Sequence, residues 1–151
     1  MSGLLAACGG FLVAVVWMDL IFDVQVLRQP RGEPLPEPVL ASIAGYYRRA
    51  TTESRPMSRL IAFVMVVAVL GSLLELVRGD GALATRASAL ALCVVPTVLA
   101  GARVLPNAVR LGQRIDDLAA QTDLARAVCR DHLLCLALIA GFTLLQLVAR
   151  N

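Results

Sequence analysis

The stretch that decides the fold extends from Leu4 to Val26 and reads LLAACGGFLVAVVWMDLIFDVQV. Asp19 and Asp23 are its only charged side chains. A helix needs about 20 mostly apolar residues to cross the hydrocarbon core of a bilayer, so this stretch predicts a membrane span. It lacks the basic N-terminal region of a secretory signal peptide, and it is longer than the apolar region of one. We therefore expect it to be retained as a transmembrane helix.

Three further apolar runs have a similar character and extend over residues 57–77, 83–104 and 132–149. Together with residues 4–26 they predict an all-α fold, an integral membrane four-helix bundle formed as a single transmembrane domain over residues 1–151. The composition agrees, because 58% of the residues are hydrophobic, 17% are charged and the mean hydropathy is +0.75. A soluble domain has about 45–50% apolar and about 25% charged residues. The composition thus excludes a disordered chain and a disulfide-rich secreted scaffold, and it argues against a soluble enzyme.

The arginines indicate how the chain is oriented. Most of them lie in or beside two long loops, residues 27–56 and 105–131. They are Arg28, Arg31, Arg48, Arg49, Arg55 and Arg59 near the first loop, and Arg103, Arg110, Arg114, Arg126 and Arg130 near the other. Because basic residues are enriched in cytoplasmic loops, we expect both loops in the cytoplasm and both termini outside. We expect the membrane to be a bacterial-type inner (plasma) membrane. The aromatic residues lie mostly inside apolar runs, so nucleic-acid binding is not indicated.

Both loops are expected to contain short helices at the membrane interface or in the cytoplasm. In the first loop, four prolines between Gln29 and Pro38 predict an extended strip. Residues 39–51 then predict a helix lying at the headgroup level, with its two tyrosines in the aromatic belt. Its apolar stripe consists of Val39, Leu40, Ile43 and Tyr47. In the second long loop, Leu111, Ile115 and Leu118 predict another helix with one apolar stripe.

Small residues at four-residue spacing suggest where helices approach closely, because transmembrane helices associate through such contacts. These residues are Ala6, Gly10 and Ala14 on the first span, and Ala137 and Gly141 on the fourth. They permit packing of the first span on the fourth, and equally a homodimer contact. Pro96 is expected to kink the third span.

Catalytic signatures of several enzyme classes are missing from the sequence. The four cysteines form no CxxC pair, and we interpret them as small buried hydrophobes. No Ser-His-Asp pattern, zinc protease motif or glycine-rich phosphate loop is present. A single histidine excludes a haem held by two imidazoles of this chain. The sequence indicates no particular cofactor.

The candidate site consists of Asp19, Asp23 and His132. The two aspartates stand at positions i and i+4, so both carboxylates point from one face of the first span. His132 begins the fourth span at the matching cytoplasmic boundary. Ionisable residues at membrane depth are functional candidates because burying them is costly. Candidate ligand-binding residues at a similar depth are Trp17, Gln25, Arg59, Arg103, Asn107 and Arg130.

Three interpretations of this cluster remain open. The aspartates could form structural ion pairs with Arg59, Arg103 or Arg130. They could form a polar pocket that binds a small ligand or relays protons, with Asp19, Asp23 and His132 as catalytic candidates. The same two carboxylates and imidazole could instead bind a metal, since such a set is a known arrangement for iron.

The first functional hypothesis is a non-enzymatic accessory protein that binds a ligand or partner through this polar cluster at its cytoplasmic end. The alternative is a membrane-embedded oxygenase, isomerase or quinone-linked oxidoreductase acting on a lipophilic substrate at the cluster. The third is a dimeric proton-coupled transporter. The expected partners are the lipid bilayer and either a second copy of the chain or another membrane protein.

Overall fold

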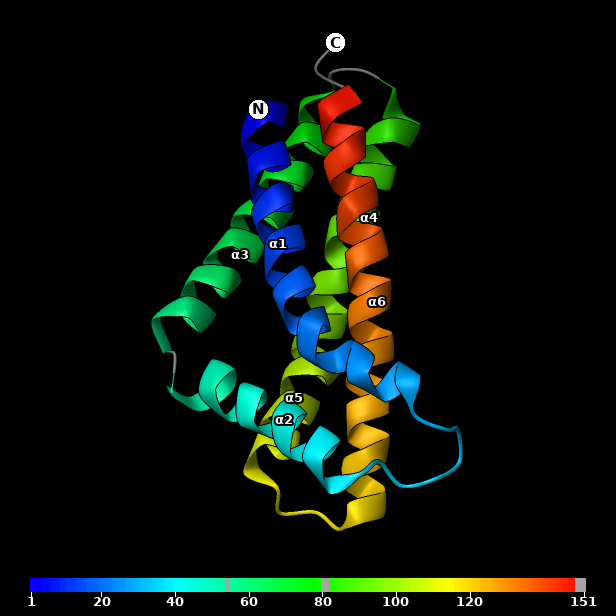
Figure 1. Cartoon of the computed structure of the whole chain (residues 1–151). Helices are drawn as coiled ribbons and strands as arrows, with labels where there is room; N and C mark the ends of the chain where they lie inside the picture. Colours follow the sequence, from blue (N-terminus) through cyan, green and yellow to red (C-terminus); the bar gives the residue numbers. More distant parts are fainter. Residues whose placement is uncertain (54, 80–81, 149–151) are drawn as a thin grey trace.

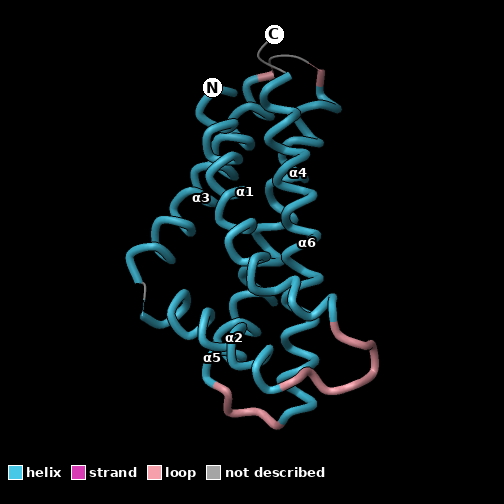
Figure 2. Tube along the Cα trace, viewed as in Figure 1, coloured by secondary structure: helices cyan, strands magenta, loops and turns pink. Residues whose placement is uncertain are grey.

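The computed structural model describes residues 1–53, 55–79 and 82–148, without the side chain of Arg55. These residues form helices joined by short loops, and they contain no strand (Figure 2). Four helices are long and apolar enough to span a membrane, which confirms the predicted all-α membrane bundle. They extend over Ser2–Arg28, Pro56–Arg78, Leu83–Gln113 and Leu118–Val148. Gly79 follows the second of these helices with a φ of +84°, a conformation that suits glycine. The predicted end of the fourth span, at Ala149, lies outside the described residues.

The elements are arranged with both chain ends at one end of the bundle and α2 and α5 at the other (Figure 1). In chain order they are α1 (Ser2–Asp23), the 3-10 turn η1 (Val24–Arg28), α2 (Glu37–Arg48), the π turn η2 (Arg49–Glu53), α3 (Arg55–Arg78), α4 (Leu83–Leu99), the π turn η3 (Ala100–Val104), α5 (Leu105–Gln113) and α6 (Leu118–Val148). Pro96 lies buried inside α4, and the helical path continues through η3 into α5.

α1 packs closely on α6 at Gly9. A Cβ atom on Gly9 would meet Oγ1 of Thr143, so a larger residue there would force the Thr143 side chain to shift. Of the small stripe that the sequence suggested on the first span, Ala6 is buried, whereas Gly10 and Ala14 are exposed. The true face of α1 includes Leu12, with a side chain that is almost fully buried.

The loop end of the molecule has its own apolar core, formed by α2, α5 and the first half of α6. Its buried members include Leu40 and Ile43 from α2, Leu111 from α5, and Val128 from α6. The predicted helix after the proline strip therefore exists, but its apolar stripe packs on protein rather than into lipid headgroups. Gly112 makes this packing possible, because a Cβ atom there would lie 2.7 Å from the backbone nitrogen of Arg48.

The second long loop contains helix as predicted, but Leu111 and Leu118 belong to two different helices, α5 and α6, and Ile115 lies between them. Arg114 adopts the left-handed conformation, with φ of +53°, and ends α5, so Ile115 is 72% exposed. The next helix, α6, then begins at Leu118, where Asp117 accepts a hydrogen bond from the backbone of Ala120 in the first turn. The segment expected to be a loop, residues 105–131, is thus mostly the continuation of two long helices.

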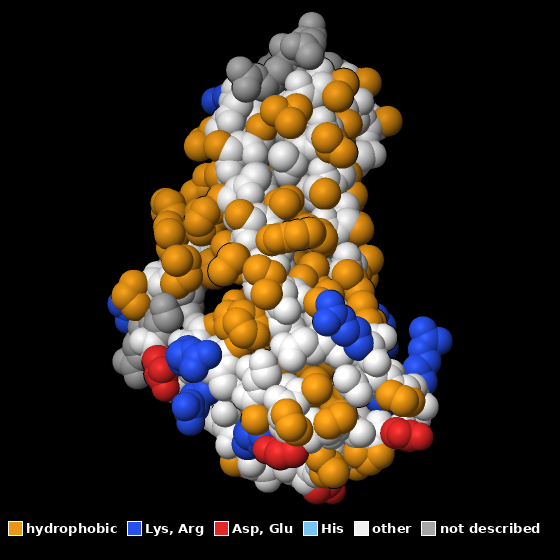
Figure 3. All heavy atoms as spheres, viewed as in Figure 1, with side chains coloured by type: hydrophobic (Ala, Val, Ile, Leu, Met, Phe, Trp, Pro, Cys, Tyr) orange, Lys and Arg blue, Asp and Glu red, His pale blue; other side chains and the backbone are white. Residues whose placement is uncertain are grey.

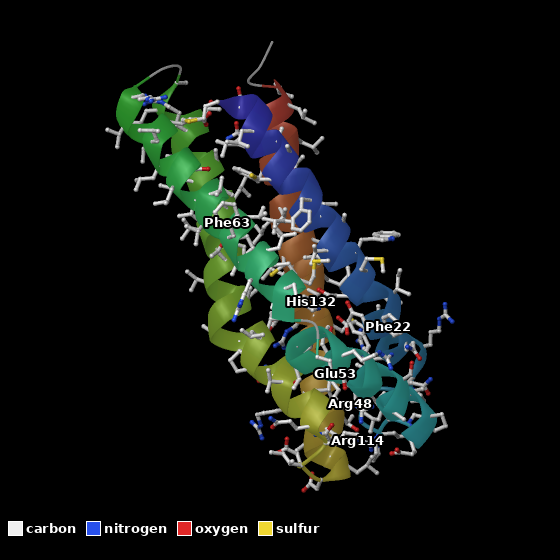
Figure 4. The ribbon with its side chains drawn as sticks, turned by 90° about the vertical axis from the view of Figure 1, so that its left-hand side faces the viewer. Phe22, Arg48, Glu53, Phe63, Arg114 and His132 are labelled. Carbon is white, nitrogen blue, oxygen red and sulfur yellow. The ribbon has the colours of Figure 1, made fainter. Side chains whose placement is uncertain are left out.

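Ion pairs and hydrogen bonds hold the connecting segments to these helices. Arg114 donates to both carboxylate oxygens of Glu37 at 2.8 Å, and this contact lowers the pKa of the Glu37 carboxyl (Figure 4 labels Arg114). The proline strip is fixed as well: the backbone N–H of Leu35 donates to Thr122 at 3.0 Å. Arg126 donates to two carbonyl oxygens of the strip, each at 2.8 Å. These bonds fix the strip to α6, although only Leu35 of the strip is buried.

The lengths of the helices relate the bundle to a bilayer. Leu83–Gln113 and Leu118–Val148 contain 31 residues each, or about 46 Å at 1.5 Å per residue, compared with about 30 Å of hydrocarbon. Both therefore extend beyond the apolar layer. Figure 3 shows charged side chains gathered over the end formed by α2 and α5, and apolar side chains over the rest of that face. The extra helix length lies at this charged end.

Candidate functional site: a buried polar network

The predicted cluster forms at the junction between the span-forming part of the bundle and the α2–α5 end. Oδ2 of Asp23, on α1, lies 2.6 Å from Nδ1 of His132, on α6. Oδ1 of Asp23 accepts a hydrogen bond of 2.7 Å from the hydroxyl of Tyr47, on α2. These three side chains are nearly closed off, with residue exposures of 0% for Asp23, 5% for His132 and 2% for Tyr47. One carboxylate thus joins three helices.

Asp19 forms the outer half of the network. Its Oδ1 accepts a hydrogen bond of 2.5 Å from Tyr46, and its Oδ2 lies 3.6 Å from Nε2 of His132. The Tyr46 ring stacks on Phe22 with a centroid separation of 4.2 Å. His132 therefore lies between two carboxylates, one at each ring nitrogen. Figure 4 shows His132 and Phe22 at the level where α2 crosses the bundle.

The two phenols are held in their neutral form. Burial raises the pKa of the Tyr47 hydroxyl far above its usual value, and the charges of Asp23 and Asp19 raise it further. Burial followed by the hydrogen bond to Asp19 likewise raises the pKa of Tyr46. Both tyrosines consequently act as hydrogen-bond donors to the carboxylates. The short bond between Asp23 and His132 requires a proton on Nδ1 if the carboxylate is ionised, which assigns the tautomer of a neutral ring.

Arginines near this level pair with a different carboxylate. Among the described residues, Asp19 and Asp23 form no ion pair with an arginine. Asp131, which is 3% exposed, lies 3.2 Å from Arg103 and 3.3 Å from Arg130. The expectation that arginines neutralise the aspartate pair is therefore wrong, and tyrosine and histidine take their place. Asp131, the residue before His132 in the sequence, pairs with the arginines instead.

The other candidate ligand-binding residues do not converge on one pocket. Gln25 is close to the network, where its amide donates to Ser42 at 3.2 Å and to the carbonyl of Phe22 at 3.0 Å. Trp17 is 61% exposed on the outer surface of α1. Arg59 is exposed on α3, and Asn107 is half-buried on α5.

Tyr46 and Tyr47 are the members of the network that sequence reasoning missed. Both were assigned to the aromatic belt, although Tyr47 already continued the apolar stripe of its predicted helix. That position placed its ring inside the protein, where a buried hydroxyl needs a hydrogen-bond partner. The signal for Tyr47 was therefore present in the sequence.

The geometry is that of a hydrogen-bonded network rather than a metal centre. The 2.6 Å contact between Asp23 and His132 leaves no space for an ion between them. No group of three His, Cys, Asp or Glu side chains among the described residues is arranged to hold a metal. Chemically, the network can fix the positions of α1, α2 and α6 and can share protons between its members.

The fold and the polar network together define an integral membrane protein in which buried hydrogen bonds join α1, α2 and α6. The family model described as ER membrane protein SH3, of the SHR3 chaperone family, matches residues 2–149. The chain belongs to this family. Comparison with curated proteins and with solved structures gave no match.

Proposed function

We propose that this protein is a non-enzymatic chaperone of the endoplasmic reticulum membrane that holds another membrane protein while it folds. The description of the family supports a location in the endoplasmic reticulum membrane, an accessory role, and another membrane protein as the partner. This proposal replaces the bacterial-type inner membrane expected from the sequence. The predicted orientation becomes one with the α2–α5 end in the cytosol and both termini in the lumen.

The observation that carries the proposal is the exposed surface of α3. Only 11% of the most apolar 18-residue stretch of this span is buried within the protein, compared with 39%, 22% and 33% for the corresponding stretches of the other three spans. It packs on α1 and α4 at the edge of the bundle (Figure 1). Its large exposed side chains include Phe63, Val66, Leu70, Leu73 and Val77. Their spacing of three and four residues is that of a helix–helix seam.

An apolar helix face in a membrane contacts lipid unless a protein replaces the lipid. A client span is a suitable replacement, since transmembrane helices associate by packing and gain little from the hydrophobic effect in lipid. Figure 4 shows Phe63 on α3, and this side chain is 65% exposed. The α3 face therefore suits brief contact with the apolar spans of another protein.

The polar network supports this function by fixing the position of α1, on which α3 packs, relative to α2 and α6. The enzyme hypothesis and the transporter hypothesis both need a substrate or proton to reach Asp23 and His132. Their exposures of 0% and 5% favour a structural role for these side chains.

The function is tested by cell-free synthesis of a multispan membrane protein into liposomes that contain the purified chain. We expect the wild-type chain to raise the fraction of monodisperse client. The double variant Phe63→Ala, Leu70→Ala should lose most of this effect. A matched control, Leu144→Ala with Leu147→Ala, changes exposed apolar side chains of α6 and should keep it. Equal loss in both variants would refute the assignment to α3, and no effect of the wild-type chain would refute the chaperone function.

The compartment and orientation are tested by glycosylation mapping in microsomes. An acceptor sequence on a spacer before Ser2 should be glycosylated, because only the lumen contains the transferase. The same acceptor inserted beside Gly32, in the proline strip, should remain unmodified. The reverse pattern would overturn the proposed orientation.

A further inference from the structure

A cavity of about 520 Å³ opens at the end of the bundle that carries the chain termini, opposite to the polar network. The described residues lining it include Glu75, Arg78, Arg86, Ala89, Leu145 and Gln146. They come from the last turns of α3 and α6 and from the beginning of α4. Its volume is in the range of small-molecule sites, about 300–1,000 Å³. The cavity therefore lies at the depth where span ends meet lipid headgroups.

Gln146 is buried in the wall of this cavity, with 2% exposure. Its amide nitrogen donates to Oε2 of Glu75 at 3.2 Å. This bond fixes the orientation of the amide, because turning it over would place its oxygen against a carboxylate. The amide oxygen is then left without a hydrogen-bond partner among the described residues. A buried acceptor without a donor costs free energy, which a bound donor would recover.

Arg86 supplies a fixed positive group on the other side. Its Nη1 donates to the carbonyl of Leu76 at 2.6 Å, which holds the guanidinium over the last turn of α3. Its Nε is buried and has no partner among the described residues. Among the described lining residues, the two guanidinium groups of Arg78 and Arg86 accompany a single carboxylate, that of Glu75. The cavity thus offers donors for an anion next to acceptors for an ammonium group.

We propose that this cavity binds a phosphoethanolamine group. The phosphate accepts from Arg86 and Arg78, for which guanidinium is a strong partner. The primary ammonium donates to Glu75 and to the free oxygen of Gln146. Ala89 and Leu145 provide an apolar wall beside these polar groups. At this depth the source is a phosphatidylethanolamine molecule of the bilayer, and soluble phosphoethanolamine has the same chemistry.

The experiment measures binding to the full chain in detergent by native mass spectrometry. Phosphatidylethanolamine, phosphatidylcholine and phosphatidylglycerol with identical acyl chains are compared. Choline has no N–H donor and glycerol has no cation, so phosphatidylethanolamine should bind at least about tenfold more tightly than either. Free phosphoethanolamine is added as a competitor. Competition at equal concentration assigns the site to the soluble compound, whereas no competition assigns it to the lipid.

Variants test the named residues. Glu75→Gln removes the charge while the new amide oxygen still accepts from Gln146, so the fold is retained and the preference for phosphatidylethanolamine should fall about tenfold. Arg86→Met should weaken all three lipids. Arg110→Met, an arginine in an exposed ion pair at the opposite end, is the matched control and should bind as wild type. Equal binding of the three lipids, or unchanged binding by Glu75→Gln, would overturn the proposal.

Discussion

Removing the carboxylate of Asp23 should destabilise the protein far more than neutralising it. Asp23→Ala leaves the Tyr47 hydroxyl and Nδ1 of His132 without the acceptor that each now contacts at 2.7 and 2.6 Å. A buried polar group left unpaired costs about 1–3 kcal/mol, so two give about 2–6 kcal/mol. Asp23→Asn keeps an oxygen for Tyr47, and its amide can donate to Nδ1 once the ring proton moves to Nε2, which faces Asp19. We expect a loss of about 1 kcal/mol for this variant.

The assay is reversible unfolding in mixed micelles, followed by circular dichroism, with free energies of unfolding compared between variants. Asp123→Ala is the matched control, because Asp123 is exposed on α6 and its loss should cost less than about 0.5 kcal/mol. A cost below about 1 kcal/mol for Asp23→Ala would show that the network carries little stability. Equal costs for the alanine and asparagine variants would refute the tautomer argument.

Two further predictions concern packing and pH. Gly112→Ala should cost about 1–3 kcal/mol in unfolding free energy because its Cβ meets the backbone of Arg48 at 2.7 Å. Gly45→Ala, on α2 with open space around it, should instead stabilise by about 0.5–1 kcal/mol. The chain has two tyrosines, and both phenol pKa values are raised in the folded state. Their ionisation should therefore be absent from absorbance spectra at about pH 10, where free tyrosine titrates. Folding stability is full below the pKa of unfolded tyrosine and should fall as the pH rises above it. Phenolate formation at ordinary pH would contradict the buried positions of Tyr46 and Tyr47.

Sequence reasoning located the four spans because a bilayer demands long apolar runs, and it brought Asp19 and Asp23 to one face because helical geometry does so. It failed where a helix has no polar side to contrast with an apolar side. In a span that is apolar on every side, no polar face indicates which side meets the bundle. Gly9 and Gly10 were for this reason indistinguishable, although only Gly9 lies in a close contact.

The end of α5 at Arg114 was missed for a different reason. The apolar residue Ile115 continued the helical pattern, and a left-handed arginine gives no signal comparable to glycine or proline. The partners of the aspartates were also misassigned, since a depth argument gives the level of a side chain and not its direction. Asp131 is the nearer partner of Arg103 and Arg130.

The distribution of polar contacts suggests why α3 can contact a client span while the other helices stay fixed relative to one another. Asp23 ties α1, α2 and α6 together with charge-assisted hydrogen bonds, which are strong where water is scarce. Among the described residues, Gln146 and Arg86 donate hydrogen bonds to the last turn of α3. Its central contact to α1 is apolar, with Leu5 packed against Gly71. Lipid or a client span can compete for such apolar contacts at little cost, whereas neither can replace the buried hydrogen bonds of the network. This difference supports α3 as the span that contacts a client.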